Sequence, residues 1–135
     1  MASISSIRSG LMTNVATISG LRTSATVPDN PNPPIAIVMP DGITFDNAFQ
    51  KGMHTYTFTV MVIVGRADER SAQNKLDGFV SGTGSSSIKL AIESDKTLNG
   101  VVFDTRVTEL RNYGSITISD VVYLVAEFAV TCYAD

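Results

Sequence analysis

The stretch His54-Thr-Tyr-Thr-Phe-Thr-Val-Met-Val-Ile-Val64 decides the fold of this chain. It lacks proline and glycine and consists mainly of β-branched and aromatic residues, which favour a strand. Its first half alternates between large side chains and threonines, whereas both faces are apolar from Met61 to Val64. At about 3.3 Å per residue, the stretch extends for roughly 36 Å. We therefore expect the central strand of a sheet, with one end inside the core and the other reaching past it.

Length and charge limit the class of protein. A chain of 135 residues forms one domain by size, so residues 1–135 are treated as a single domain. The net charge of −3 argues against nucleic-acid binding through a basic face. No run approaches the roughly 20 apolar residues of a membrane helix, and the N-terminus lacks the apolar region of a signal peptide. One cysteine forms no internal disulfide, so a cytoplasmic product is the simplest interpretation.

The segments before the central strand predict a helix, a connector and short strands. One side of the first helix, capped by Ser3 and ended by Gly20, carries Ile4, Ile7, Leu11, Val15 and Ile18. A short strand is expected over residues 21–27, followed by a stiff proline-rich connector over residues 28–34. Residues 35–39 form a short apolar strand that Pro40-Asp41-Gly42 ends in a turn. Residues 43–45 start another strand, joined to the central one by a projecting loop.

The part after the central strand predicts two helices and two long strands. The helices carry apolar stripes and are joined by a flexible Gly-Ser link over residues 82–87; the stripes are Ala72, Leu76, Phe79 and Val80, then Ile88, Ala91 and Ile92. Strands are expected over residues 101–113 and 121–133, with a hairpin turn at Asn112-Tyr113-Gly114. This order predicts an α+β fold in which an antiparallel β-sheet has its helices packed on one face.

The last strand has more apolar surface than one face of a sheet requires. One face is fully apolar, and the other, which carries Tyr123 and Val125, is more apolar than a solvated face. We expect no cover for this second face within the chain. Other copies of the protein are the expected cover.

A search for catalytic chemistry finds no convincing set. His54 is the single histidine, so a two-histidine metal site is ruled out, and a surface or interface histidine is favoured over a general base. Cys132 lies on the apolar face of its strand, which favours a buried, inert thiol over a nucleophile. Gly78, Gly82 and Gly84 faintly resemble a phosphate loop, but no Gly-Lys-Ser/Thr follows them. The sequence predicts a protein that is not an enzyme and has no cofactor or metal.

Two polar segments of the sequence can each be interpreted in two ways. Thr55, Thr57 and Thr59 form either a solvent face or a mildly polar face lining an interior passage. The charges of residues 66–70 form either a partner surface or a solvated helix start. The candidate interface residues are the projecting loop, this charged patch and the second face of the last strand: Asp46, Asn47, Phe49, Gln50, Lys51, Arg66, Asp68, Glu69, Arg70, Tyr123 and Val125.

Four motifs carry a family resemblance. They are Arg66-Ala-Asp-Glu-Arg-Ser-Ala-Gln-Asn-Lys-Leu-Asp77, Gly84-Ser-Ser-Ser-Ile-Lys89, Arg106-Val-Thr-Glu-Leu-Arg-Asn-Tyr-Gly114 and Tyr123-Leu-Val-Ala-Glu-Phe-Ala-Val130. As a combination, together with the amino-terminal helix and the proline-rich connector, they resemble the tail terminator proteins of long, non-contractile-tailed phages infecting actinobacteria.

The resemblance implies a structural virion protein in the phage tail or neck, assembled in the host cytoplasm. Its subunits would form a homohexameric ring that caps the tail tube, ends tube growth and joins the tail to the head connector. The implied partners are the chain itself, the tail tube protein and the connector protein, with DNA passing through the channel without specific binding. Alternatives are another neck or tail component, such as a tube or head-completion protein, or a small ligand-binding or enzyme domain.

Overall fold

Strand β3 (His54–Arg66) lies in the middle of a five-stranded sheet, as its sequence predicts. The computed structural model describes residues 3–18, 20–24, 34–45, 53–66 and 71–134. The other strands are β1 (Arg22–Ser24), β2 (Ile35–Thr44), β4 (Asp104–Ile118) and β5 (Val121–Ala134), and the helices are α1 (Ile4–Val15), α2 (Ala72–Val80) and α3 (Ile88–Glu93). The strand order is β1-β2-β3-β5-β4.

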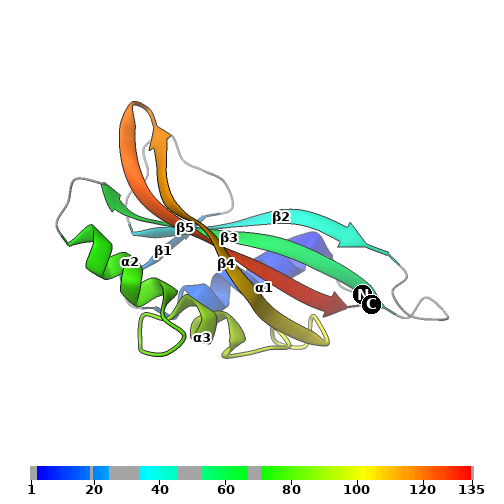
Figure 1. Cartoon of the computed structure of the whole chain (residues 1–135). Coiled ribbons are helices and arrows are strands. Elements are labelled where there is room, and N and C mark those ends of the chain that lie inside the picture. The colour runs from blue at the N-terminus through cyan, green and yellow to red at the C-terminus, as the bar shows by residue number, and fades with distance from the viewer. Residues whose placement is uncertain (1–2, 19, 25–33, 46–52, 67–70, 135) are drawn as a thin grey trace.

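The sheet is mixed, although we expected it to be antiparallel. Strands β2, β3, β5 and β4 pair antiparallel, but the three-residue β1 runs parallel to β2. Residues 25–34 separate β1 from β2 along the chain, and a parallel pair needs such a separation because a tight hairpin cannot join parallel strands. The expected α+β class is confirmed, with all three helices beneath one face of the sheet (Figure 1).

The helix-facing side of the sheet forms the main core. Alternate residues of β3, namely Phe58, Val60 and Val62, are buried there at 1% exposure or less. Helix α1 packs Ile7 and Leu11 against them. Ser3 begins α1 as expected, because its hydroxyl accepts the Ser6 N–H while the Ser6 hydroxyl accepts the Ser3 N–H. The helix ends at Val15, however, rather than at Gly20.

The expected turn at Pro40-Asp41-Gly42 is wrong, because β2 continues through it. The register passes from Pro40 opposite Phe58 to Gly42 opposite Thr57, which leaves Asp41 as the extra residue of a β-bulge. Strand β1 pairs only with Ile35 to Ile37 of β2, so no strand of the described residues pairs with Pro40 on that side. A proline is tolerated there because its missing N–H breaks no ladder bond.

The hairpin turn expected at Asn112-Tyr113-Gly114 is also wrong. Arg111 pairs with Glu127 and Gly114 pairs with Val125, so this segment is an irregularity inside β4 and does not end the strand. The chain reverses later, at Ser119 and Asp120, which have positive φ angles of 49° and 67°. A two-residue turn with both φ angles positive matches the twist of a hairpin.

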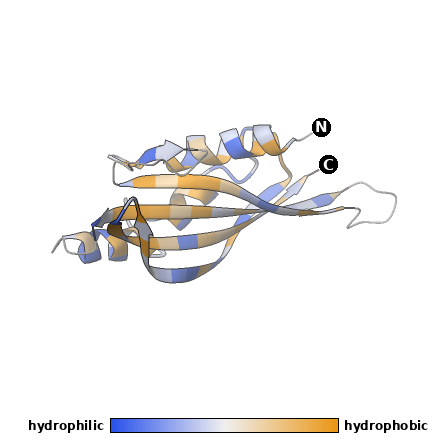
Figure 2. Cartoon of the chain, turned by 90° about the horizontal axis from the view of Figure 1, so that it is seen from above, coloured by the Kyte–Doolittle hydropathy of each residue, from blue (hydrophilic) through white to orange (hydrophobic). Residues whose placement is uncertain are grey.

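The helix-free face is divided into two halves. One half is a second apolar cluster, which consists of Ile35, Ile37, Met61, Ile63, Tyr123 and Val125. The other half follows Thr55, Thr57 and Thr59 along β3 and is only partly buried. Figure 2 views the chain from above, and its strands change from mainly hydrophobic to more hydrophilic along their length.

Candidate functional site

The candidate interface residues fall into two groups. Asp46, Asn47, Phe49, Gln50, Lys51, Asp68, Glu69 and Arg70 lie outside the described residues. Arg66, Tyr123 and Val125 are described, and they lie at one end of the sheet, where Arg66 pairs with Tyr123 and Ile63 pairs with Val125. Arg66 is exposed.

Tyr123 and Val125 correct the expectation that their face has no cover within the chain. Their side chains are 7% and 5% exposed in the single chain. Ile116 and Ile118, near the end of β4, flank the second cluster, and β4 and β5 continue together past the end of β3 (Figure 1). Because sheets twist, side chains from neighbouring strands close around one another on this face. The alternation along β5 indicated apolar residues on both faces but did not reveal this cover.

Among the described residues, the exposed apolar surface lies elsewhere, on large side chains that the sequence did not single out. They are Phe45, Leu90, Phe103, Leu110, Tyr113 and Val122, all at least 40% exposed. Alternation along a strand shows which face is apolar, but it does not show at which positions along that face neighbouring elements cover the side chains. The sequence signal was therefore too weak to identify these residues.

An aromatic group marks one end of the sheet. Phe45, 66% exposed, follows the last residue of β2, and its ring lies edge-on to the imidazole of His54 at 5.4 Å between centroids. His54 also meets Tyr56 edge-on at 6.4 Å. Phe103, 58% exposed, is anchored at the same end because its N–H donates to the Tyr133 carbonyl, and Tyr133 pairs with Thr55. We call Phe45 and Phe103 the aromatic end.

A second exposed group lies at the opposite end. Val122 is 44% exposed and lies next to Tyr123, which pairs with the last residue of β3. Tyr113 is 46% exposed and lies in β4, between Arg111 and Gly114, where the pairing with β5 is irregular. Its hydroxyl donates a 3.0 Å hydrogen bond to the Asp77 carboxylate on α2. Gln73 of α2 also bonds both Asp77 and the Tyr113 hydroxyl. We call Val122 and Tyr113 the hairpin end.

Cys132 is a buried thiol, as expected. It is fully buried, and the Thr105 hydroxyl donates to its Sγ at 3.6 Å. Burial raises the pKa of the thiol to about 11. The nearby charge of Asp104 raises the pKa further, whereas the hydrogen bond from Thr105 lowers it. A thiol that stays protonated at neutral pH is a poor nucleophile.

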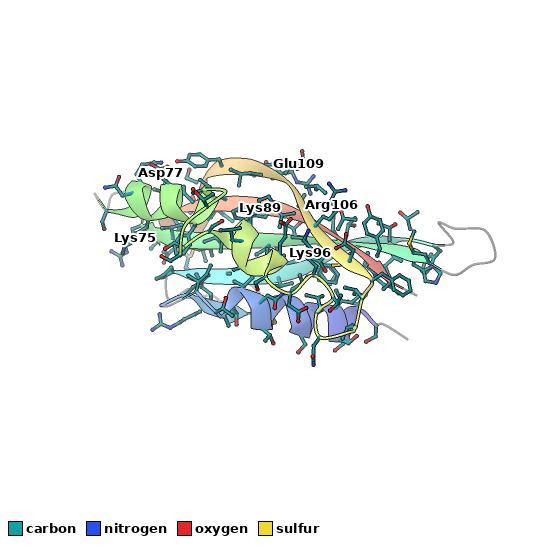
Figure 3. All side chains as sticks on the ribbon, turned by 90° about the horizontal axis from the view of Figure 1, so that it is seen from below. Lys75, Asp77, Lys89, Lys96, Arg106 and Glu109 are labelled. Atoms are coloured by element: carbon teal, nitrogen blue, oxygen red, sulfur yellow. The ribbon has the colours of Figure 1, made fainter. Side chains whose placement is uncertain are left out.

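The Gly-Ser segment is a linker that ends in a helix cap. The Ser87 hydroxyl accepts the Leu90 N–H at 3.2 Å and donates to the Ser81 carbonyl at 2.6 Å, so it joins the end of α2 to the start of α3. The structure therefore gives this serine a capping role. On the side with the helices, the charged side chains are dispersed over α2, α3, the turn that follows α3, and β4, as Lys75, Asp77, Lys89, Lys96, Arg106 and Glu109 show (Figure 3).

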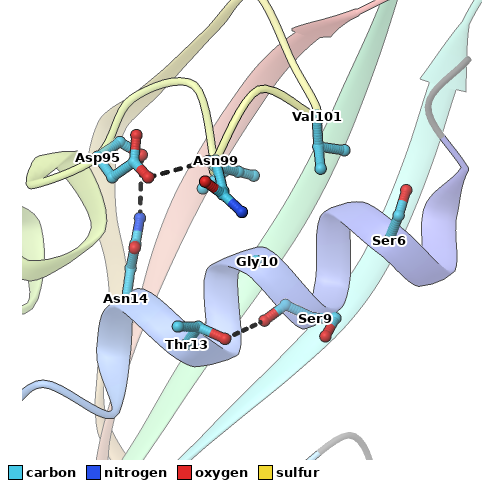
Figure 4. A pocket seen from close by; sticks show the side chains of 9 residues that line it. Ser6, Ser9, Gly10, Thr13, Asn14, Asp95, Asn99 and Val101 are labelled. Atoms are coloured by element: carbon cyan, nitrogen blue, oxygen red, sulfur yellow. Dashed lines mark hydrogen bonds between the residues drawn. The ribbon is translucent and has the colours of Figure 1, made fainter.

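A pocket of about 240 Å³ lies between α1 and the turn that follows α3. Its walls are mostly small or polar and comprise Ser6, Ser9, Gly10, Thr13, Asn14, Asp95, Leu98, Asn99 and Val101 (Figure 4). Asn14, only 7% exposed, donates its two amide hydrogens to the carbonyls of Ile92 and Asp95. The turn is thereby tied to the helix.

The turn itself has an unusual backbone. Leu98, Asn99 and Gly100 have successive φ angles of 51°, 60° and 87°. Two of these residues are not glycine, and such conformations persist only where the surroundings hold them. The Asp95 carboxylate accepts both the Asn99 N–H and the Thr97 hydroxyl, and Leu98 is buried against α1. These contacts account for the backbone without a ligand.

The described residues hold neither a metal-binding cluster nor a membrane-spanning helix. Among them, no group of three or more histidine, cysteine, aspartate or glutamate side chains is placed to hold a metal ion. None of the helices within the described ranges has the length and apolar character needed to cross a membrane.

Comparisons with known proteins give no family. No protein-family model matches the chain, and no curated protein sequence matches it. The fold alone defines the class, which is an α+β protein with a mixed five-stranded sheet and helices on one face.

Proposed function

We propose that this chain is a structural virion subunit that forms a hexameric ring of the tail terminator kind. In this role the ring caps the tail tube, ends its growth and joins the tail to the head connector, with a central channel for DNA. The family resemblance of the sequence suggests this role, and the distribution of exposed apolar side chains supports self-association.

The observation that carries the proposal is that two different exposed apolar groups lie at opposite ends of one long sheet. The aromatic end exposes Phe45 and Phe103, and the hairpin end exposes Val122 and Tyr113. Strand β3 runs between the two ends over His54 to Arg66, a distance of roughly 40 Å at about 3.3 Å per residue.

Two unlike groups favour a head-to-tail contact. A twofold dimer uses the same patch on both copies, whereas a contact between unlike patches repeats around a ring when its rotation closes. Burial of exposed aromatic and aliphatic surface supplies the main free energy of such a contact. The proposed interface therefore joins the aromatic end of one copy to the hairpin end of the next. Tyr123 and Val125 act beneath it as core residues and do not form its surface.

The test is the mass of the purified protein in solution. Light scattering across a concentration series should give a species of about six times 14.4 kDa, the mass of one chain. Phe45→Ser and Phe103→Ser should shift the species to lower mass and leave the circular dichroism of the subunit unchanged. A matched control is Leu90→Ser, since Leu90 is 45% exposed on α3, away from both ends. A monomer up to millimolar concentration would contradict the proposal.

A second candidate, a small ligand-binding domain, is favoured by one observation. The 240 Å³ pocket between α1 and the turn includes the buried Asn14 and combines polar and apolar surface. Ligand pockets are usually larger, at about 300–1,000 Å³, and mostly apolar. A monomer whose amide resonances near Gly10 and Asn99 respond to a small molecule would favour this alternative over a ring.

A further inference from the structure

Strand β4 is one of the two outer strands of the sheet, and among the described residues no strand pairs with its second edge. It is long, running from Asp104 to Ile118, and most of its residues are exposed. An outer strand presents backbone N–H and C=O groups to any other strand that approaches, which makes it a site for unwanted pairing. The way in which this edge is covered therefore bears on how copies of the chain associate.

One backbone donor of this edge is occupied by a helix side chain. The Glu93 carboxylate, at the end of α3, accepts the Val107 N–H through Oε2 at 3.0 Å. Its other oxygen accepts the Lys89 ammonium at 2.6 Å, one helical turn earlier. The Glu93 side chain is 15% exposed, so the carboxylate lies against the sheet rather than in open solvent.

The contact is made where the ladder between β4 and β5 is irregular. Val107 pairs with Val130 and Glu109 pairs with the next residue, Ala129, so Thr108 is an extra residue. The Thr108 hydroxyl donates to the Ala129 carbonyl at 3.2 Å and so holds the irregular position to β5. The bulge and the Glu93 contact together fix the edge at this point.

The charge of Glu93 strengthens the contact. Partial burial raises the pKa of the carboxyl group, but hydrogen bonds from Lys89 and Val107 and the charges of Lys89 and Lys96 outweigh it, so the pKa is lowered. Glu93 is therefore ionised at neutral pH. A hydrogen bond from a backbone N–H to a carboxylate is stronger than one between neutral groups.

In one antiparallel register, the charges along β4 complement those along β4 of a second copy. An antiparallel pairing that places Val107 opposite Thr108 of a second copy also places Arg106 opposite Glu109 and Arg111 opposite Asp104. Opposite charges facing each other across two strands stabilise the pair. Within the described part of the chain, the opposite edge consists of the three-residue β1 and of β2 beyond Ile37, where Pro40 lacks an N–H.

We propose that Glu93 is an autoinhibitory contact that keeps β4 from pairing with β4 of a second copy of this chain. While the carboxylate accepts the Val107 N–H, this donor cannot bond to the backbone of an incoming strand, and α3 lies in the way. When the carboxylate is withdrawn, the edge accepts the second copy antiparallel, about a twofold axis. This pairing differs from the head-to-tail contact of the proposed ring and does not depend on it.

The experiment compares Glu93→Ala with wild type by light scattering at equal concentrations. The variant should reach twice the wild-type mass and show the infrared band of intermolecular strands. Lys89→Ala is the matched control, because it breaks the same ion pair but leaves the carboxylate on Val107, so its mass should equal that of wild type. Glu93→Ala combined with Glu109→Arg places like charges opposite each other, and it should return to the wild-type mass.

Three results would overturn the proposal. One is an unchanged mass for Glu93→Ala, and another is pairing that persists in the double variant. The third is measured in the wild-type protein and does not depend on how any variant folds. Hydrogen exchange of the Val107 amide should be slowed by about tenfold or more by the carboxylate. An amide that exchanges as fast as those of exposed loops would show that the contact does not hold the edge.

Discussion

Leu98 packs directly on Gly10: a Cβ atom at position 10 would lie 2.8 Å from the Leu98 Cβ. No real pair of such atoms comes this close, so a larger residue at position 10 must push the turn away from α1. The left-handed conformation of Leu98 limits how far the turn can adjust. This contact explains why a glycine occupies the middle of a helix.

The first prediction is that Gly10→Ala destabilises the protein. Alanine gains helix propensity, worth up to about 1 kcal/mol, but overpacking in a fixed contact costs about 1–3 kcal/mol. The free energy of unfolding, from urea denaturation, should therefore fall. The matched control is Gly78→Ala in α2, where the added Cβ would lie 3.8 Å from its nearest neighbour. That change should stabilise the protein by about 0.5–1 kcal/mol. A gain for both variants would contradict the close contact.

The second prediction concerns two valines of β5, one exposed and one buried. Val125→Asp places a carboxylate in the second cluster, where the native side chain is 5% exposed, and should destabilise the subunit by about 4 kcal/mol or more. Val122→Asp changes a side chain that is 44% exposed and should leave the unfolding free energy within about 0.5 kcal/mol. Thermal unfolding measures both.

The mass of the assembled species should also distinguish the two variants, but here the change at Val122 should have the larger direct effect. Val122→Asp should lower the mass of the assembled species although the subunit stays folded, because Val122 belongs to the hairpin end. If Val125→Asp instead left the subunit folded and only prevented assembly, Val125 would be an interface residue after all, and the second cluster would not be part of the core.

The third prediction is that Cys132 does not react in the folded protein. Its pKa is raised to about 11 by burial, so almost no thiolate exists at pH 8. A thiol-specific reagent should label Cys132 only after denaturant is added. Cys132→Ser should cost about 1–3 kcal/mol because it buries a hydroxyl, and it should leave assembly intact. Rapid labelling under native conditions would mean that the strand opens or that the thiol is accessible.

The fourth prediction is a loss of stability at acid pH that depends on Glu93. Because the folded-state pKa is lowered, the contribution of the carboxylate is fully present above its ordinary pKa of 4.5 and is lost as pH falls through the lower folded-state value. Unfolding free energies of wild type should therefore fall more steeply below about pH 4.5 than those of Glu93→Gln. Parallel curves for the two proteins would show that Glu93 makes no favourable contact in the folded state.

The parts of the fold that local chemistry decides were predictable from sequence. The cap at Ser3 needs only neighbouring residues, and β3 carries the two-sided apolar pattern of a central strand. The proline at position 40 misled the prediction, because a proline ends a strand only where its N–H would face a partner. Here the partner strand β1 stops at the residue opposite Ile37, a fact that no local pattern contains.

The candidate site was less predictable, for a related reason. The apolar pattern of β5 correctly showed two apolar faces, but the cover over Tyr123 and Val125 comes from residues far apart in sequence, such as Ile35 and Ile116. Asn112 likewise has a positive φ angle, which suits a turn, but it lies within β4, where its amide bonds the Glu127 carboxylate at 2.8 Å. Positive φ angles mark irregular backbone and do not tell a turn from a bulge.

The central claim is that copies of this chain meet head to tail and close into a ring. Electron micrographs of the purified protein, averaged by class, test it most directly. The account predicts closed rings with six subunits and a central channel, and it predicts that Phe45→Ser abolishes them. Single subunits, twofold dimers or open filaments in the wild-type images would contradict it.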